Sequence, residues 1–259
     1  MIFILLLAVL ASSVLGAVPA AAHPHAPGYY VMRNTEHRQP ALPPEFSYIE
    51  KYDAFYLDRR HGDSNEEKVI YLTFDAGYEN GNIEKILDIL AEKEVPAAFF
   101  ILDNLIKRNK DLVLRMKDEG HLVCNHTMRH RDMSKILDPE AFAAELRSLE
   151  KLYSEEIGGE MAKYYRPPEG RFCEENLRQA QALGYKTVFW SIAYADWDNN
   201  KQPSEDEAIK KLLDNTHNGA IVLLHPTSST NAAILSRMID RWRALGYRFG
   251  TLDELGTSV

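Results

Sequence analysis

One carboxylate and two histidines are the residues in this sequence whose types and spacing best suit catalysis. Asp75 follows the apolar run 69–74, and His126 and His130 stand four positions apart further along the chain. A carboxylate can serve as a general base and two imidazoles can share a metal ion, which together would suit a metal-assisted hydrolase. Each signal is weak alone, because Asp75 could equally turn the chain before Gly77.

The spacing of the two histidines carries a structural expectation. If the segment after the apolar run 122–124 is helical, His126 and His130 lie one turn apart on the same face and can bind one ion. Such pairs also arise by chance as surface or capping residues. We interpret the nearby His121, which lies among apolar neighbours, as a structural histidine.

A second carboxylate and a further histidine also end apolar segments. Asp196 follows the run 189–194, and His225 ends the run 221–224. An aspartate bonded to an imidazole fixes its tautomer and raises its basicity, which would make His225 a general acid near neutral pH. A core histidine satisfied by backbone groups would show the same pattern.

An arginine at the end of another apolar strand begins a stiff loop. Arg166 is followed by Pro167, Pro168, Glu169 and Gly170. The prolines restrict the backbone and the glycine frees it, so the loop can hold the arginine and its amides in place. A simple rigid turn is the alternative.

These residues require elements that bring them together. From Lys68 onward, short apolar runs alternate with amphipathic ones, the pattern of buried parallel strands joined by helices. The sequence predicts seven strands, at 69–74, 96–101, 121–124, 164–166, 187–190, 220–224 and 247–251. Helices are predicted over 83–90, from Pro139 with Asp138 as its cap, and over 235–242.

Composition limits the class of protein. The chain has 259 residues, 45% of them hydrophobic, and a net charge of -8. Such a chain can form one large domain, and the acidic balance argues against nucleic acid as a partner. The two cysteines, Cys124 and Cys173, could pair or remain free.

The beginning of the chain predicts export. Residues 1–15 are almost wholly apolar and lead to small residues at 20–22, so residues 1–22 are predicted to be a signal peptide, with an uncleaved membrane anchor as the alternative. Residues 23–64 lack sustained periodicity and are predicted to be an N-terminal extension of a single catalytic domain at 65–259.

In this order, the five segments resemble the polysaccharide deacetylase family, carbohydrate esterase family four, over residues 68–255. The segments that carry the resemblance are Thr-Phe-Asp-Ala-Gly at 73–77, His-Thr-Met-Arg-His at 126–130, Arg-Pro-Pro-Glu-Gly at 166–170, Asp-Trp at 196–197 and Leu-His at 224–225. The resemblance implies an α/β fold, a distorted (β/α) barrel of fewer than eight strands. This agrees with the seven predicted above.

The resemblance also implies roles for the residues. Asp75 would be the base, His225 the acid, and His126 and His130 the ligands of a divalent metal, with zinc preferred. Arg166 would orient Asp75, Asp196 would tune His225, and the Glu169 amide would stabilise the oxyanion. Tyr194 and Trp197 could stack on sugar rings.

Residues 71–81 look most like the branch called delta-lactam-biosynthetic de-N-acetylases, which act on N-acetylmuramic acid of sporulation-associated peptidoglycan. The implied partner is the peptidoglycan glycan strand in the cell wall or spore envelope, with no stable protein partner. Deacetylation of N-acetylglucosamine or of O-acetylated glycans is one alternative function, and a non-catalytic glycan-binding domain is another.

One position departs from the family pattern. Ala76 stands where the family usually has a second aspartate, which ligates the metal, although members of this branch commonly lack it too. His126 and His130 would then share the ion with solvent or substrate oxygens. We expect weaker metal binding and a more positive site, suited to the muramic carboxylate.

Overall fold

The computed structural model of the chain describes residues 28–256. The predicted signal peptide at 1–22 lies outside the described residues. Within them, no helix is both long enough and apolar enough to cross a membrane.

Eight strands form one sheet in the order β1-β6-β5-β4-β3-β2-β7, with β8 also paired to β2. Every pair of strands in register is parallel. The strands are β1 (Ala54–Phe55), β2 (Lys68–Ala76), β3 (Ala97–Ile101), β4 (Leu122–Asn125), β5 (Ala162–Tyr165), β6 (Lys186–Val188), β7 (Ala220–Leu224) and β8 (Tyr247–Phe249). The seven predicted strands are β2 to β8, and the distorted barrel is confirmed.

The sheet curls into a barrel that the chain beyond β6 helps to close. Ile192 forms a parallel bridge with Val222 of β7, and the Ser191 amide donates to the Ile221 carbonyl at 2.9 Å. Past β1, Leu57 makes an antiparallel bridge to Ala220 of the same strand. The two ends of the sheet therefore meet through short irregular segments.

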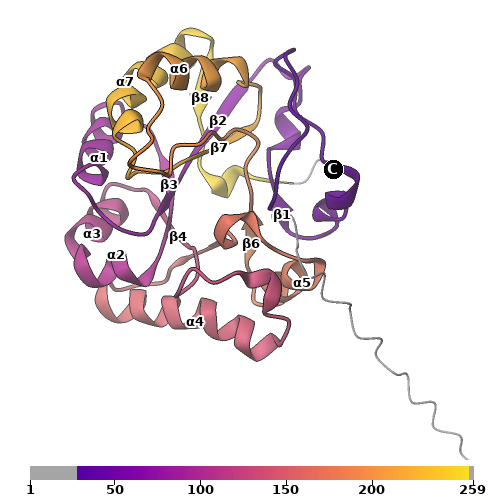
Figure 1. Cartoon of the computed structure of the whole chain (residues 1–259), viewed down its shortest axis with the longest axis vertical. Coiled ribbons are helices and arrows are strands. Elements are labelled where there is room, and N and C mark those ends of the chain that lie inside the picture. The colour runs from indigo at the N-terminus through magenta and orange to yellow at the C-terminus, as the bar shows by residue number, and fades with distance from the viewer. Residues whose placement is uncertain (1–27, 257–259) are drawn as a thin grey trace, which may run out of the picture.

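Helices surround the sheet (Figure 1). They are α1 (Ile83–Glu92), α2 (Asp103–Arg108), α3 (Lys110–Asp118), α4 (Pro139–Glu156), α5 (Glu174–Ala182), α6 (Glu205–Asp214) and α7 (Ser229–Ala244). The predicted cap is present at α4, where the Asp138 carboxylate accepts from the Ala141 amide at 2.7 Å. This helix ends before Gly158, whose φ of 84° only glycine adopts readily.

Alternation along β2 decides which way its side chains face. Ile70, Leu72 and Phe74 belong to the large apolar cluster shared with the outer helices, whereas Val69 and Tyr71 belong to the cluster inside the barrel. Side chains two positions apart share a face, so Thr73 and Asp75 point inward. The period of the strand thus directs the predicted base into the barrel.

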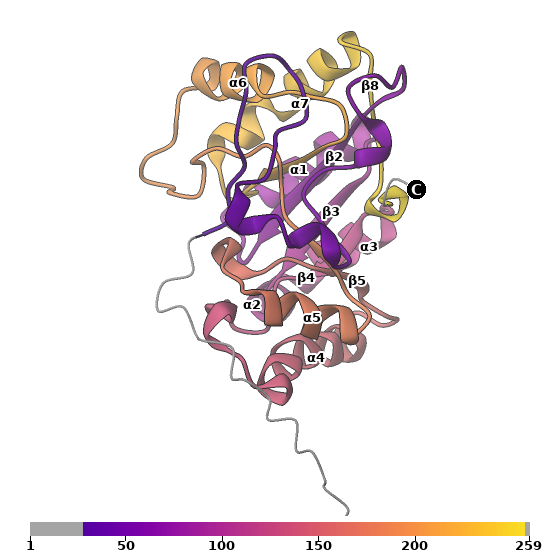
Figure 2. The ribbon, with the colours of Figure 1, turned by 90° about the vertical axis from the view of Figure 1, so that its right-hand side faces the viewer.

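The predicted extension packs onto the barrel. Its Ala54 and Phe55 form β1 beside β6, a two-residue strand too short for sequence periodicity to reveal. Tyr29 stacks on Phe189 with ring centroids 4.5 Å apart. Figure 2 shows this segment, in indigo, crossing in front of the sheet.

Candidate active site

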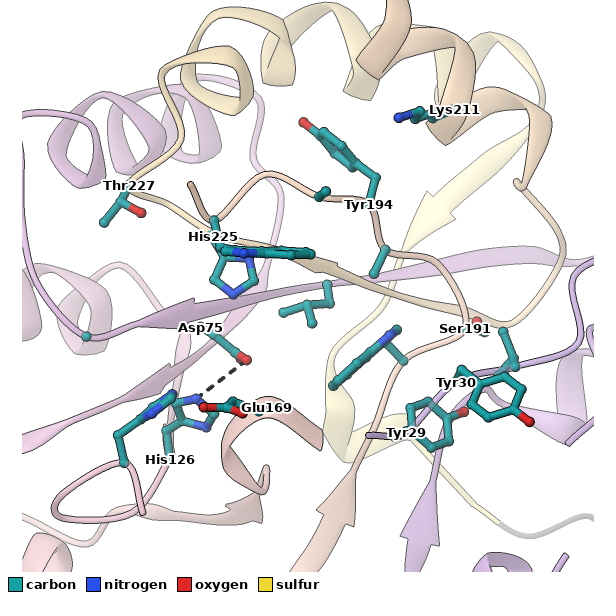
Figure 3. A pocket seen from close by; sticks show the side chains of 18 of the residues that line it. Tyr29, Tyr30, Asp75, His126, Glu169, Ser191, Tyr194, Lys211, His225 and Thr227 are labelled. Carbon is teal, nitrogen blue, oxygen red and sulfur yellow. Dashed lines mark ion pairs between the residues drawn. The ribbon is translucent and has the colours of Figure 1, made fainter. Parts of the chain in front are cut away.

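A cavity of about 1020 Å³ opens at the carboxyl ends of the strands. Asp75 reaches it from β2, His126 follows β4, and His225 follows β7. Parallel strands present their carboxyl ends on one side of a barrel, so residues distant in sequence converge there. Asp75 lies between His126 and His225 (Figure 3).

Arg166 holds Asp75 in place from inside the protein. Its side chain is fully buried, and its Nη1 donates to Asp75 Oδ1 at 2.8 Å. The other guanidinium nitrogens donate to Thr73 Oγ1 at 2.8 Å and to the carbonyls of Val188 and Phe189 at 2.9 and 3.1 Å. With each nitrogen occupied, the guanidinium has one orientation.

This ion pair sets the protonation state of Asp75. Burial, the largest influence, would raise the pKa of the carboxyl, but the charges of Arg166, His126 and His225 together with the Arg166 hydrogen bond outweigh it, and the resulting pKa lies below the usual value. Asp75 is therefore ionised at neutral pH and able to accept a proton.

His126 turns one nitrogen toward Asp75. Its Nδ1 lies 2.9 Å from the Arg166 carbonyl, which can only accept, so Nδ1 carries the proton. Burial lowers the pKa of His126 to about 4, so the ring is neutral near pH 7. Its Nε2 lone pair then faces Asp75 Oδ2 at 3.6 Å.

His130 meets His126 through a turn, which corrects the helical expectation for this segment. Residues 126–131 form no helix, and Thr127 and His130 have φ values of 73° and 52°. The Thr127 hydroxyl accepts from the His130 amide at 3.0 Å and stabilises the turn. The rings nevertheless meet edge to face, with centroids 5.1 Å apart.

The donor set fits a cation. A neutral imidazole lone pair and a carboxylate oxygen face each other without a proton between them, with a second imidazole adjacent. Within residues 28–256, no three His, Cys, Asp or Glu side chains group as a ready-made metal centre. Ligands beyond the two imidazoles would thus come from solvent or substrate.

Asp196 and His225 form the second pair. Asp196 Oδ1 lies 2.7 Å from His225 Nδ1, and its Oδ2 accepts from the His225 amide at 2.9 Å. Burial would lower the pKa of His225, but the hydrogen bond and charge of Asp196 prevail and raise it above the usual value. His225 therefore keeps its second proton to a higher pH than an ordinary histidine does, with Nε2 left for a substrate.

Sequence reasoning missed the residue that supports this pair. Asn231, buried on α7, donates Nδ2–H to Asp196 Oδ2 at 2.6 Å and to the His225 carbonyl at 3.0 Å. Its Oδ1 accepts from the Tyr194 hydroxyl. An asparagine on an otherwise apolar helix face was the available signal.

The loop after β5 places Glu169 at the cavity. Glu169 has a φ of 56°, and the next residue, Gly170, has 63°, so the chain turns sharply here. No acceptor within residues 28–256 pairs with the Glu169 amide. The side chain is half exposed and pairs with Arg171 Nε at 3.0 Å.

Ala76 is fully buried and does not line the cavity. Its methyl group belongs to the apolar cluster facing the helices. Yet Ala76 pairs in register with Ile101, whose carbonyl accepts from the His126 amide at 3.1 Å. Position 76 is thus separated from the histidines by one intervening strand, β3.

Aromatic side chains form much of the rim. Trp197 is 60% exposed beside His225, as a sugar platform would be, whereas Tyr194 is buried and its hydroxyl is bound to Asn231. The extension adds a wall that sequence reasoning missed. It contributes Tyr29, Tyr30, Val31 and Arg33.

The two cysteines do not form a disulfide with each other. Cys124 and Cys173 are both free, and Cys124 is buried inside the barrel. Burial raises the pKa of the Cys124 thiol well above its usual value, so it is not a nucleophile near neutral pH.

Comparison with known proteins identifies the family of the chain. Residues 62–188 match the polysaccharide deacetylase family. The chain is 39% identical to the peptidoglycan-N-acetylmuramic acid deacetylase PdaA of Bacillus subtilis over 93% of this chain and 90% of that protein. The structure of PdaA, a family 4 carbohydrate esterase, superimposes with a TM-score of 0.82 at 38% identity, covering 88% and 95% of the two chains.

More distant relatives differ in activity. A peptidoglycan-N-acetylglucosamine deacetylase of Bacillus cereus is 30% identical over 81% of this chain and 74% of that protein. A family 4 pseudoenzyme from Bacillus anthracis has a TM-score of 0.69 at 27% identity, covering 78% and 68% of the chains. The extent of the match to PdaA confirms the predicted family, and this chain belongs to the polysaccharide deacetylases, family 4 of the carbohydrate esterases.

Proposed function

We propose that this protein hydrolyses the N-acetyl group of N-acetylmuramic acid residues in peptidoglycan, releasing acetate and leaving a free amine. The observation that carries the proposal is that an ionised Asp75 and a His225 whose pKa is raised by Asp196 face one cavity (Figure 3). Hydrolysis of an amide requires such a base and acid. Similarity to PdaA over most of both chains supports the choice of sugar.

The two halves of the reaction fall to different residues. Asp75, fixed by Arg166, accepts a proton from the attacking water, whose oxygen bonds to the acetyl carbon. His225 gives its Nε2 proton to the amine nitrogen as the C–N bond breaks, and Asp196 stabilises the cation until then. The free Glu169 amide donates to the developing oxyanion, a contribution worth ~3 kcal/mol for a positioned donor.

Deacetylases of this family are generally metal-dependent. We propose that His126 and His130 hold a zinc ion, because neutral imidazoles suit zinc. When bound, such an ion polarises the acetyl oxygen and lowers the pKa of water. The Arg166 carbonyl contributes by keeping the proton of His126 on Nδ1.

Two finer proposals follow, the first from the branch resemblance and the second from the beginning of the sequence. The amine produced would close onto the lactyl group as a muramic δ-lactam, in the spore cortex. The apolar residues 1–15 and the small residues at 20–22 support export to the cell wall, with residues 1–22 removed as a signal peptide. Determining the amino terminus of the secreted protein tests the second.

A second candidate function is deacetylation of N-acetylglucosamine, as in the Bacillus cereus relative. A non-catalytic glycan-binding domain, left after loss of the metal ligand at position 76, is the third candidate, and a pseudoenzyme occurs in the family. Retention of Asp75, Arg166, Asp196 and His225 in bonded pairs favours catalysis, because binding alone needs no acid and base.

The test uses peptide-free oligomers of alternating N-acetylglucosamine and N-acetylmuramic acid. Mass spectrometry of the product locates any deacetylated sugar, with zinc supplied or removed by chelation and with Asp75→Asn as the inactive control. We expect loss of one acetyl mass on muramic residues only. Deacetylation confined to N-acetylglucosamine would establish the second candidate, and no acetate under any condition would establish the third.

A further inference from the structure

The wall that the extension adds to the cavity contains an arginine without a counterion. Arg33 is exposed and lines the cavity with Tyr29, Tyr30 and Val31. The wall is fixed to the catalytic loop, because the Tyr29 amide donates to the Gly170 carbonyl at 3.0 Å. A Cβ at Gly170 would lie 3.0 Å from Tyr29 Cβ, so the two segments are in close contact.

Arg33 is also hydrogen-bonded to the chain segment that follows β6. Its Nη2 donates to the Ala193 carbonyl at 2.6 Å, at the start of the segment that carries Tyr194, Asp196 and Trp197. This bond uses one guanidinium nitrogen and leaves Nε and Nη1 with no hydrogen-bond acceptor among residues 28–256. Nη2 carries a second hydrogen, so the edge formed by that N–H and the neighbouring Nε–H or Nη1–H can still meet the two oxygens of a carboxylate.

Among the charged side chains that line the cavity, those without an ion-pair partner in the described part of the chain are positive. Of its acidic lining residues, Asp75 is paired with Arg166 and Glu169 with Arg171. Its basic residues, Arg33 and Lys211, make no ion pair with any carboxylate in the described part of the chain. The protein carries a net charge of -8, so an unpaired positive edge here stands out against its surroundings.

We propose that Arg33 is a specificity residue that binds the lactyl carboxylate of N-acetylmuramic acid, with Lys211 adding to the positive potential. The inference rests on the proposed function and names the group that the site recognises. N-acetylglucosamine lacks the lactyl carboxylate and would leave Arg33 solvated. Preference between the two sugars thus arises at the extension, while the acid and base serve either sugar.

The test compares two peptide-free oligomers that differ only in the lactyl group, which is a free carboxylate in one and a primary amide in the other. Binding is measured by calorimetry with the Asp75→Asn protein in the presence of zinc, and kcat/KM with the active protein. We expect the carboxylate form to be favoured by about 10-fold or more in Kd and KM, from the usual worth of a charge-assisted hydrogen bond.

Arg33→Gln should abolish this preference and Arg33→Lys should keep part of it, since lysine retains charge but not the fork. Arg38→Gln is the matched control: Arg38 lies on the same extension, pairs with Glu36 and does not line the cavity. It should leave the preference unchanged. The ratio by which the wild-type protein favours the carboxylate oligomer should also decrease as salt is added, because Arg33 is exposed.

The inference would be overturned if Arg33→Gln still favoured the carboxylate oligomer as strongly as the wild type does. It would also be overturned if the substitution weakened the binding of both oligomers equally. Failure of the proposed function looks different, because the wild-type protein would then release no acetate from muramic residues. An Arg33-dependent binding preference measured in the same experiment would still support the carboxylate site. Melting temperatures of all variants establish that they are folded.

Discussion

Arg166 contacts both reactive partners on its side of the cavity: its guanidinium binds the carboxylate of Asp75, and its main-chain carbonyl accepts from Nδ1 of His126. One residue therefore fixes the charge of the base and the tautomer of the proposed metal ligand. It does so without reaching the substrate, because it is buried and does not line the cavity.

Arg166→Lys should impair catalysis severely. A lysine cannot reproduce the bonds to Asp75, Thr73 and the two carbonyls, and misplacing the base costs on the order of 100-fold in kcat/KM. With the charge less well placed, the pKa of Asp75 should rise, so the acidic limb of the pH profile moves to higher pH. Arg171→Lys, an exposed arginine on the same loop, is the control and should leave that limb in place.

Asp196→Asn should move the basic limb of the profile. The raised pKa of His225 means that the acid is protonated below that pKa and activity falls as pH rises through it. Without the Asp196 charge the pKa of His225 drops, so the fall begins at lower pH, and activity at pH 7 should decrease about 100-fold or more. Asp198→Asn, at a nearby exposed position, should behave as wild type.

Tyr194→Phe tests whether the Tyr194 hydroxyl supports the active site or contacts the substrate. The buried hydroxyl binds Asn231, so its removal leaves the Asn231 oxygen unpaired and should cost about 1–2 kcal/mol of the free energy of unfolding. The KM should stay near the wild-type value. A raised KM with unchanged melting temperature would instead assign the Tyr194 hydroxyl to substrate binding.

His121 should be a site of stabilising substitution. The ring is buried beside Phe99, and neither of its nitrogens has a partner within the described residues. Burial lowers the pKa of His121, so the folded state favours the neutral ring, and stability falls as pH drops below the ordinary histidine value of about 6.5. His121→Leu should therefore raise the melting temperature, more at pH 5 than at pH 8. A decrease at both pH values would mean that the ring is bonded after all.

Ala76→Asp should tighten zinc binding and weaken turnover of muramic substrates. The new carboxylate would be separated from His126 by one intervening strand, β3, but in the absence of metal it would be buried in an apolar cluster and destabilising. We expect a lowered melting temperature that zinc restores beyond the wild-type shift. Ala76→Asn has the same shape without the charge, and an equal zinc shift in both variants would contradict the prediction.

Strong local patterns made much of this structure predictable. The runs around Phe74, Phe99 and Val222 are buried on both faces, which is why their strands could be located, and the Asp138 cap marked the start of α4. The ordered motifs located Asp75, Arg166, Asp196 and His225 because each follows a strand or the chain leaving one.

Other features depend on contacts that sequence does not display. The two histidines meet through a turn stabilised by Thr127, not through a helix, and a positive φ cannot be read from residue types there. The role of Asn231 appears only when α7 is placed beside Asp196. Similarly, β1 is too short to show a period, and its strand exists because β6 offers it an edge.

The extension's wall has an evolutionary consequence. The pattern common to the family begins at residue 62, whereas Tyr29 and Arg33 border the cavity from outside it. Substitutions in this segment can change which glycan is accepted without altering any group that moves a proton. Under the proposal for Arg33, new specificities can therefore arise in the extension while Asp75 and His225, which belong to the barrel, stay unchanged.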